Sequence, residues 1–89
     1  MSMYGANPDE LEHLGLTLTR QIDAVNGVLG TVGGVLRSTT WMGPARERFV
    51  GEWDSSFTSA LQRLTEAFDA AGADCRRRAG ELRRVMGAA

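Results

Sequence analysis

The chain has 89 residues, 43% of them hydrophobic, and a net charge of −1, a composition that is typical of one small folded domain. Its ten basic residues are balanced by eleven acidic ones, which argues against nucleic-acid binding because such proteins usually carry a strongly basic face. One Cys and one His cannot build a Cys/His metal site, and no run of about 18 apolar residues could span a membrane. We therefore expect no metal or other cofactor, no nucleic-acid partner and no stable membrane insertion.

The sequence NPDE, at residues 7–10, predicts the start of a first helix. Asn7 can cap this helix with its side-chain oxygen, Pro8 suits the first helical position, and the two acids favour the positive end of the helix dipole. Apolar residues then recur at alternating spacings of four and three, with Gly15 in one gap. They are Leu11, Leu18, Ile22, Val25, Leu29, Val32 and Leu36. This heptad pattern predicts a helix over residues 8–38 with one continuous packing face.

The segment STTWMGP, at residues 38–44, predicts a turn at 39–43 and a second helix start. Gly43 supplies backbone freedom for the reversal, and Pro44 suits the first position of the new helix. Apolar residues at three- and four-residue spacing then predict a helix over residues 44–86. We expect its packing face to contain Val50, Trp53, Phe57, Leu61, Leu64, Phe68, Ala71, Cys75, Ala79, Leu82 and Met86.

Two long helices joined by a turn this short can only lie antiparallel. No segment alternates with a period of two, so we predict an all-α fold, a single two-helix antiparallel hairpin over residues 1–89. A domain this small buries only about 60–65% of its unfolded surface, and small helical proteins often make up for this by dimerising, which we also expect here. Trp41 is expected to fold over the ends of the two apolar faces at the turn.

Several residues around the turn form a recognisable motif. Trp41 and Gly43 stand in the turn, Pro44 follows them, and the aromatic residues Phe49 and Trp53 come at helical spacing. With this arrangement the chain resembles the WXG family, small helical hairpins that are also called ESAT-like proteins. In that family a Trp-x-Gly motif lies in the turn between two long helices, and an aromatic residue follows about six positions later. The resemblance covers the whole chain.

The resemblance implies a function in the type VII secretion systems of actinobacteria and related Gram-positive bacteria. Members are made in the cytoplasm without a signal peptide, pair as homodimers or heterodimers, often as four-helix bundles, and leave through an ATPase-driven membrane complex. They act as substrates or as escorts of a larger secreted effector or toxin. We therefore expect this chain to pair with itself or with a second WXG-type protein, and to contact the secretion ATPase.

One departure from the family concerns export. Many exported members carry a Tyr-x-x-x-Asp/Glu signal after the second helix, whereas this sequence ends ELRRVMGAA, without Tyr. A partner could carry the signal, the protein could remain in the cytoplasm as a dedicated partner, or the chain could be cut short.

The first helix offers a candidate dimer surface opposite its packing face. Interior glycines cost about 0.8–1 kcal/mol each relative to Ala, and close approach of a second helix would explain three of them on one face. The alternative interpretation is a weak helix that faces solvent. The candidate residues are Leu16, Gly27, Val28, Gly30, Gly34 and Val35.

The end of the second helix is expected to extend beyond the first, and it presents Arg83, Arg84 and Met86 as candidates for docking to a partner or to the secretion machinery. The alternative for such an Arg-rich segment is a solvated helix end. No nucleophile–base pair and no phosphate-binding loop is present, so we predict that the protein is not an enzyme. A second functional interpretation is a cytoplasmic antiparallel coiled-coil adaptor, unrelated to secretion, in which WMG only closes the turn.

Overall fold

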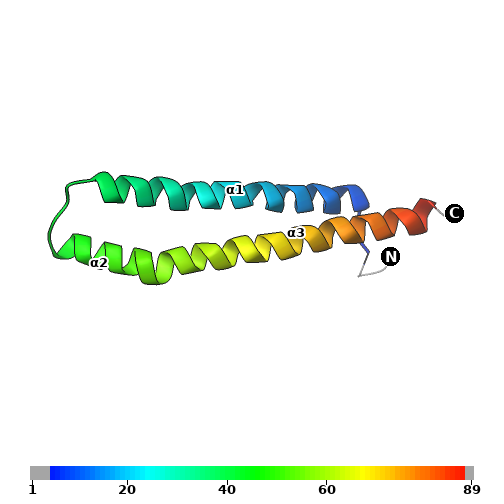
Figure 1. Ribbon diagram of the computed structural model, residues 1–89. Coiled ribbons are helices and arrows are strands. Elements are labelled where there is room, and N and C mark those ends of the chain that lie inside the picture. Colours follow the sequence, from blue (N-terminus) through cyan, green and yellow to red (C-terminus); the bar gives the residue numbers. More distant parts are fainter. Residues whose placement is uncertain (1–4, 88–89) are drawn as a thin grey trace.

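The computed structural model describes residues 5–87, which form one long helical hairpin (Figure 1). The outgoing arm is helix α1, Pro8–Ser38. The return arm contains α2, Pro44–Glu52, then the π-helical turn η1, Trp53–Phe57, and finally α3, Thr58–Gly87. The described residues contain no strand, so the predicted all-α hairpin is confirmed.

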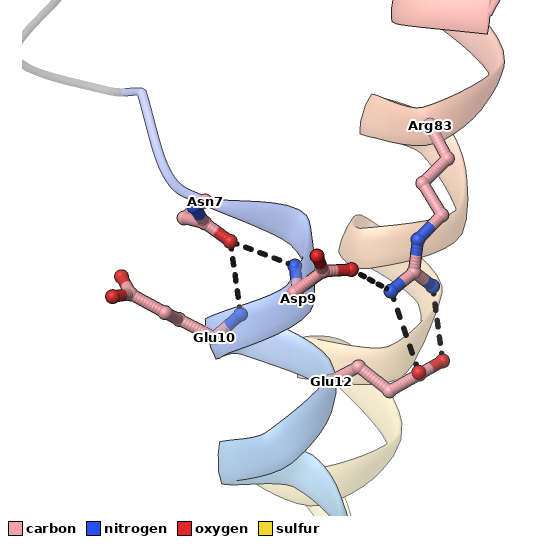
Figure 2. Close-up of polar contacts among 5 residues, drawn as sticks. All are labelled: Asn7, Asp9, Glu10, Glu12 and Arg83. Atoms are coloured by element: carbon pink, nitrogen blue, oxygen red, sulfur yellow. Dashed lines mark hydrogen bonds and ion pairs between the residues drawn. The ribbon is translucent and has the colours of Figure 1, made fainter.

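Helix α1 begins with the cap that the sequence predicts. The Asn7 side-chain oxygen accepts hydrogen bonds from the backbone N–H groups of Asp9 and Glu10, at 2.9 and 3.1 Å (Figure 2). These two donors belong to the first turn of the helix, where they have no partner within the helix itself. The cap therefore fixes the start of α1 at Pro8.

The turn requires glycine at position 43. Gly43 has φ +124° and ψ 175°, and it is the only described residue with a positive φ. This backbone region is essentially restricted to glycine, because a side chain there is strained. A Cβ at Gly43 would meet no other atom within 4 Å, so the backbone conformation alone explains the residue.

Helix α1 packs along α3 and diverges from α2. The Cα atoms that come within 8 Å of α1 from the return arm belong to α3, and the two arms separate toward the turn (Figure 1). The backbones approach closely at Gly15 and Gly72: a Cβ on Gly15 would lie 2.9 Å from the carbonyl oxygen of Gly72. The pair of glycines thus allows α1 and α3 to come into close contact away from the turn, in the half of the hairpin that holds the start of α1.

The packing face of α1 follows the predicted heptad, but the face predicted for the return arm is wrong in part. Phe57, Leu64 and Ala71 are exposed, whereas the residues that follow each of them, Thr58, Thr65 and Gly72, are half-buried or buried. Met86 is also exposed. The predicted and observed faces share Leu61, Phe68, Cys75, Ala79 and Leu82.

The π-helical turn explains this shift. Trp53 and Thr58 both turn toward α1, although five residues separate them and an α-helix would place such residues about 140° apart. The wider turn of a π-helix, with hydrogen bonds between residues five apart, brings them back into line. The Thr58 N–H donates to the Trp53 carbonyl in this way. As a result Phe57 lies beside the packing face and Thr58 lies on it.

The hairpin has a thin core. Among the described hydrophobic residues only Trp53 and Ala79 are buried, and no large side chain is fully buried. The radius of gyration is 19.5 Å, against about 12 Å for a compact domain of this length. Most apolar side chains between the helices therefore remain partly open to solvent.

Candidate interaction surface

The hairpin has two long sides, one on each flank of the line where α1 and α3 pack together. A group of ion pairs lies on the first of these sides. The Arg83 guanidinium of α3 donates hydrogen bonds to the Glu12 carboxylate, at 3.0 and 3.3 Å, and to Asp9, at 2.7 Å (Figure 2). The hydrogen bonds to Glu12, and next the one to Asp9, raise the pKa of Arg83 above its ordinary value. Glu12 and Arg83 each directly follow a packing residue, Leu11 and Leu82.

Thr19 and Arg76 extend this first side. A Cβ on Gly72 would lie 3.0 Å from the Thr19 hydroxyl oxygen, and a Cβ on Gly15 would lie 2.9 Å from Cγ of Arg76. Both residues again directly follow a packing residue of their own helix. We call this flank, with Glu12, Thr19, Arg76 and Arg83, the polar side.

The residues that directly precede a packing residue lie on the opposite flank of each helix. Because the polar flanks of α1 and α3 coincide, their opposite flanks also share one side of the hairpin. On this flank α1 contributes Leu14, Val28 and Val35. The return arm contributes Phe57, the last residue of η1, and Leu64 of α3. Their exposed fractions lie between 39% and 59%. We call this flank the apolar side and define it by these five residues.

The apolar side carries no formal charge over most of its length. Within residues 14–35 and 57–71, the other positions that helical spacing places on the apolar side are all uncharged. These are Thr17, Gln21, Ala24 and Thr31 of α1, and Ala60, Ala67 and Ala71 of α3. Charged residues of the same spans, such as Arg20, Asp23 and Glu66, fall on the outward faces or on the polar side. The two flanks of the hairpin therefore differ sharply in polarity.

An aromatic cluster lies at the turn end of the apolar side. The ring of Phe49 is central, with centroid distances of 6.3 Å to Trp41, 6.1 Å to Trp53 and 6.2 Å to Phe57. Such aromatic pairs each contribute about 0.5–1.5 kcal/mol beyond their buried area. Trp53 is buried, whereas the other three rings are 36–40% exposed. The cluster holds the turn against α2 and presents three aromatic surfaces to solvent.

Trp41 covers the turn ends of the packing faces only in part. It lies against Phe49 of α2, lines a hollow with Val32 and Leu36 of α1, and is 40% exposed. The arms diverge at the turn, so the ring reaches α2 and leaves an open groove beside α1. This groove has a volume of about 320 Å³ and is lined by Thr31, Val32, Val35, Leu36, Thr39 and Trp41. It continues the apolar side as far as the turn.

The candidate dimer residues on α1 do not form one surface. Val28 and Val35 belong to the apolar side, whereas Leu16 and the three glycines face outward, away from α3. A Cβ at Gly27, Gly30 or Gly34 would meet nothing within 4 Å. Packing within the hairpin therefore gives no reason for these glycines.

The three docking candidates near the end of α3 also differ in their surroundings. Arg83 is engaged by Asp9 and Glu12, while Arg84 and Met86 are exposed near the end of α3, which extends past the start of α1 (Figure 1). Sequence reasoning missed Leu14, Phe57 and Leu64 as surface residues. Each directly precedes a packing residue, and this spacing is the signal that could have identified them.

Within residues 5–87, no three His, Cys, Asp or Glu side chains come together as a metal site would require. None of the helices in this described part combines the length and apolar composition needed to cross a membrane. Comparisons with family models, with curated proteins and with solved structures give no match.

Proposed function

We propose that this chain is a WXG-type helical hairpin that dimerises and takes part in type VII secretion, as a substrate or as the partner of a substrate. The observation that carries the proposal is the placement of Trp41 and Gly43 at the turn of the hairpin. Gly43 has the backbone conformation that requires glycine, and Trp41 joins Phe49 in the aromatic cluster. A motif in the turn of a helical hairpin is the arrangement that the family resemblance implies.

The two sides of the hairpin suit a binding protein. Exposed aromatic rings at the turn supply rigid contact area of the kind that is enriched in interface hot spots. The polar side can remain hydrated while a partner covers the apolar side. The proposed partners are a second copy or another WXG-type chain, together with a larger secreted effector or toxin and the secretion ATPase.

The proposal is tested by expressing a tagged chain in an actinobacterium with an intact type VII system and in the same strain without the secretion ATPase. We expect the protein in the culture medium of the intact strain only, with a cytoplasmic enzyme as the control for cell lysis. The Trp41→Ala variant should be exported less, at equal cellular amounts. Retention of the wild-type chain in both strains, with the neighbouring gene products present, would favour a cytoplasmic coiled-coil adaptor.

A further inference from the structure

A cavity distinct from the apolar groove lies between the two arms, where α1 and α2 diverge toward the turn. It has a volume of about 250 Å³ and is lined by residues of both arms. The charged ones are Arg37 of α1, Arg46 of α2 and Asp54 of η1. Arg37 and Asp54 directly follow the packing residues Leu36 and Trp53, so the cavity faces the polar side. A partner on the apolar side would therefore leave it accessible.

Arg46 places a positive charge on the packing face of α2. It stands four residues before Val50 and seven before Trp53, the spacing of packing positions along a helix. Its side chain is 34% exposed, and its one ion pair within residues 5–87 joins it at 3.2 Å to the adjacent, mostly exposed Glu47. Such a surface pair contributes little, whereas a charge drawn out of water needs a good partner. The charge between the arms is therefore poorly compensated.

Arg37 brings a second positive charge to the same cavity. Its guanidinium lies over Gly33, where an added Cβ would be 3.4 Å from Nη1, so the head group is held at the cavity wall. In the described part of the chain no carboxylate forms an ion pair with Arg37, and Asp54 forms none with either arginine. Two cations from opposite arms repel each other, and the arms diverge here (Figure 1). An anion between them would replace that repulsion with two attractions.

We propose that this cavity binds free phosphate, as hydrogen phosphate, between Arg37 and Arg46. A guanidinium presents paired N–H donors that match phosphate oxygens, and these charge-assisted hydrogen bonds are strong. Asp54 repels a fully ionised anion but can accept a hydrogen bond from one that keeps a proton. Hydrogen phosphate keeps a proton at neutral pH, whereas sulfate has none and a phosphate monoester loses its last one near pH 6.

The remainder of the cavity wall suits an ionic ligand. Leu36, Val50 and Trp53 line it, and Trp53 is buried. Apolar walls of this kind strengthen electrostatic contacts relative to open water. The volume of about 250 Å³ leaves room for the anion and for bridging waters, each of which takes about 30 Å³. Trp53 and Asp54 are also the first two residues of η1, and π-helical turns often occur at functional sites.

The test is isothermal titration calorimetry of the purified full chain with inorganic phosphate, at about pH 7.5 and at an ionic strength held constant with sodium chloride. The proteins are the wild type, Arg37→Gln, Arg46→Gln and the matched control Arg48→Gln. Arg48 is an exposed arginine of the same helix as Arg46, and it does not line this cavity. Circular dichroism on the same samples verifies that each variant keeps its helices.

We expect the wild type and Arg48→Gln to bind phosphate equally. Arg37→Gln and Arg46→Gln should each raise the dissociation constant by about 10-fold or more, because each removes a charge-assisted contact. Sulfate should bind the wild type more weakly than phosphate, and Asp54→Asn should remove that preference. The absence of saturable binding by the wild type up to about 10 mM phosphate would overturn the inference, as would unchanged binding by the double variant Arg37→Gln/Arg46→Gln.

Phenyl phosphate distinguishes the two sources of a phosphate group. Free phosphate is the ligand if phenyl phosphate binds more weakly, as its missing proton and the carboxylate of Asp54 predict. Tighter binding of phenyl phosphate would overturn the assignment to free phosphate and give the cavity to a phosphate monoester. The inference uses neither dimerisation nor secretion, so its failure would leave the proposed function unaffected.

Discussion

At the scale of single residues, the glycines fall into three groups with different physical roles. Gly15 and Gly72 lie where two backbones approach closely, and Gly43 adopts a positive φ. A Cβ added at an outward glycine, such as Gly27, would meet no other atom within 4 Å. Alanine substitution separates the outward glycines from the other two groups, because it should stabilise the protein at an outward glycine and destabilise it at Gly15 or Gly43.

Gly15→Ala should lower the free energy of unfolding by about 1–3 kcal/mol, as overpacking typically does. The added Cβ would lie 2.9 Å from the backbone oxygen of Gly72, and the helices must separate to admit it. Gly27→Ala is the control and should raise stability by up to about 1 kcal/mol through helix propensity. Urea denaturation at one fixed protein concentration measures both, and stabilisation by Gly15→Ala would show that the backbones do not meet there.

Gly43→Ala should also destabilise the protein, here by about 1–3 kcal/mol, because the φ of +124° strains any side chain. Gly51→Ala is its control within α2, since Gly51 is exposed and an added Cβ there meets no other atom within 4 Å. The control should be neutral or stabilising in the same denaturation experiment. Equal effects of the two substitutions would contradict the turn geometry.

At the scale of secondary structure, the return arm shows how a heptad pattern can be ambiguous. Leu61, Phe68 and Cys75 fit either of two possible packing faces of the return arm. The first face is completed by Phe57, Leu64 and Ala71. The second is completed by the residues one position later, Thr58, Thr65 and Gly72. Hydrophobicity alone favours the first, which is the face predicted from the sequence. The structure has the second, because Gly72 permits close contact with Gly15.

The π-helical turn leads to a prediction about the length of the return arm. Deleting Ser56 would place Trp53 four residues before Thr58, the spacing that a continuous α-helix needs to keep both toward α1. We therefore expect the deletion variant to have slightly higher helicity and a higher melting temperature, with Trp53 still buried by its fluorescence. Ser56 is exposed, and deletion of the exposed Ala70 in α3 is the control, which should destabilise strongly because it breaks the heptad. A destabilised Ser56 deletion would be evidence against the π-helical turn.

Ion pairing between the arms leads to a second prediction at this scale. Arg83→Ala should lower the melting temperature modestly at low salt, because Glu12 and Asp9 lose their partner, whereas Arg84→Ala should change little. The difference should vanish near 1 M salt, where the screening length is about 3 Å. The pKa of Arg83 is raised on folding, so its contribution is complete below the unfolded-state pKa and is lost only as the pH rises through the folded value. We therefore expect no dependence on Arg83 titration between about pH 6 and 9.

At the scale of the whole molecule, sequence reasoning succeeds where local signals decide the outcome. The cap at Asn7, the heptad of α1 and the Gly-Pro helix start all follow from short-range rules, and the structure has them. The position of Trp41 and the apolar side could not be derived in this way. Both depend on how the two arms are rotated and where they diverge, which the π-helical turn and the glycine contact determine.

The thin core also predicts how the whole molecule responds to concentration. With only Trp53 and Ala79 buried among the described hydrophobic residues, a single hairpin has little to stabilise it. If a second copy completes the core, mass action makes the melting temperature rise with protein concentration. Thermal unfolding at about 5 and 200 μM checks this, and a melting temperature independent of concentration would contradict it.

The most direct test of the central claim is the solution mass of the purified wild-type chain, measured by light scattering. The account predicts a helical species of twice 9.6 kDa, formed by two hairpins that cover each other's apolar side. A well-folded, highly helical monomer of 9.6 kDa at about 200 μM would contradict the account, because it would show that the apolar side needs no second copy.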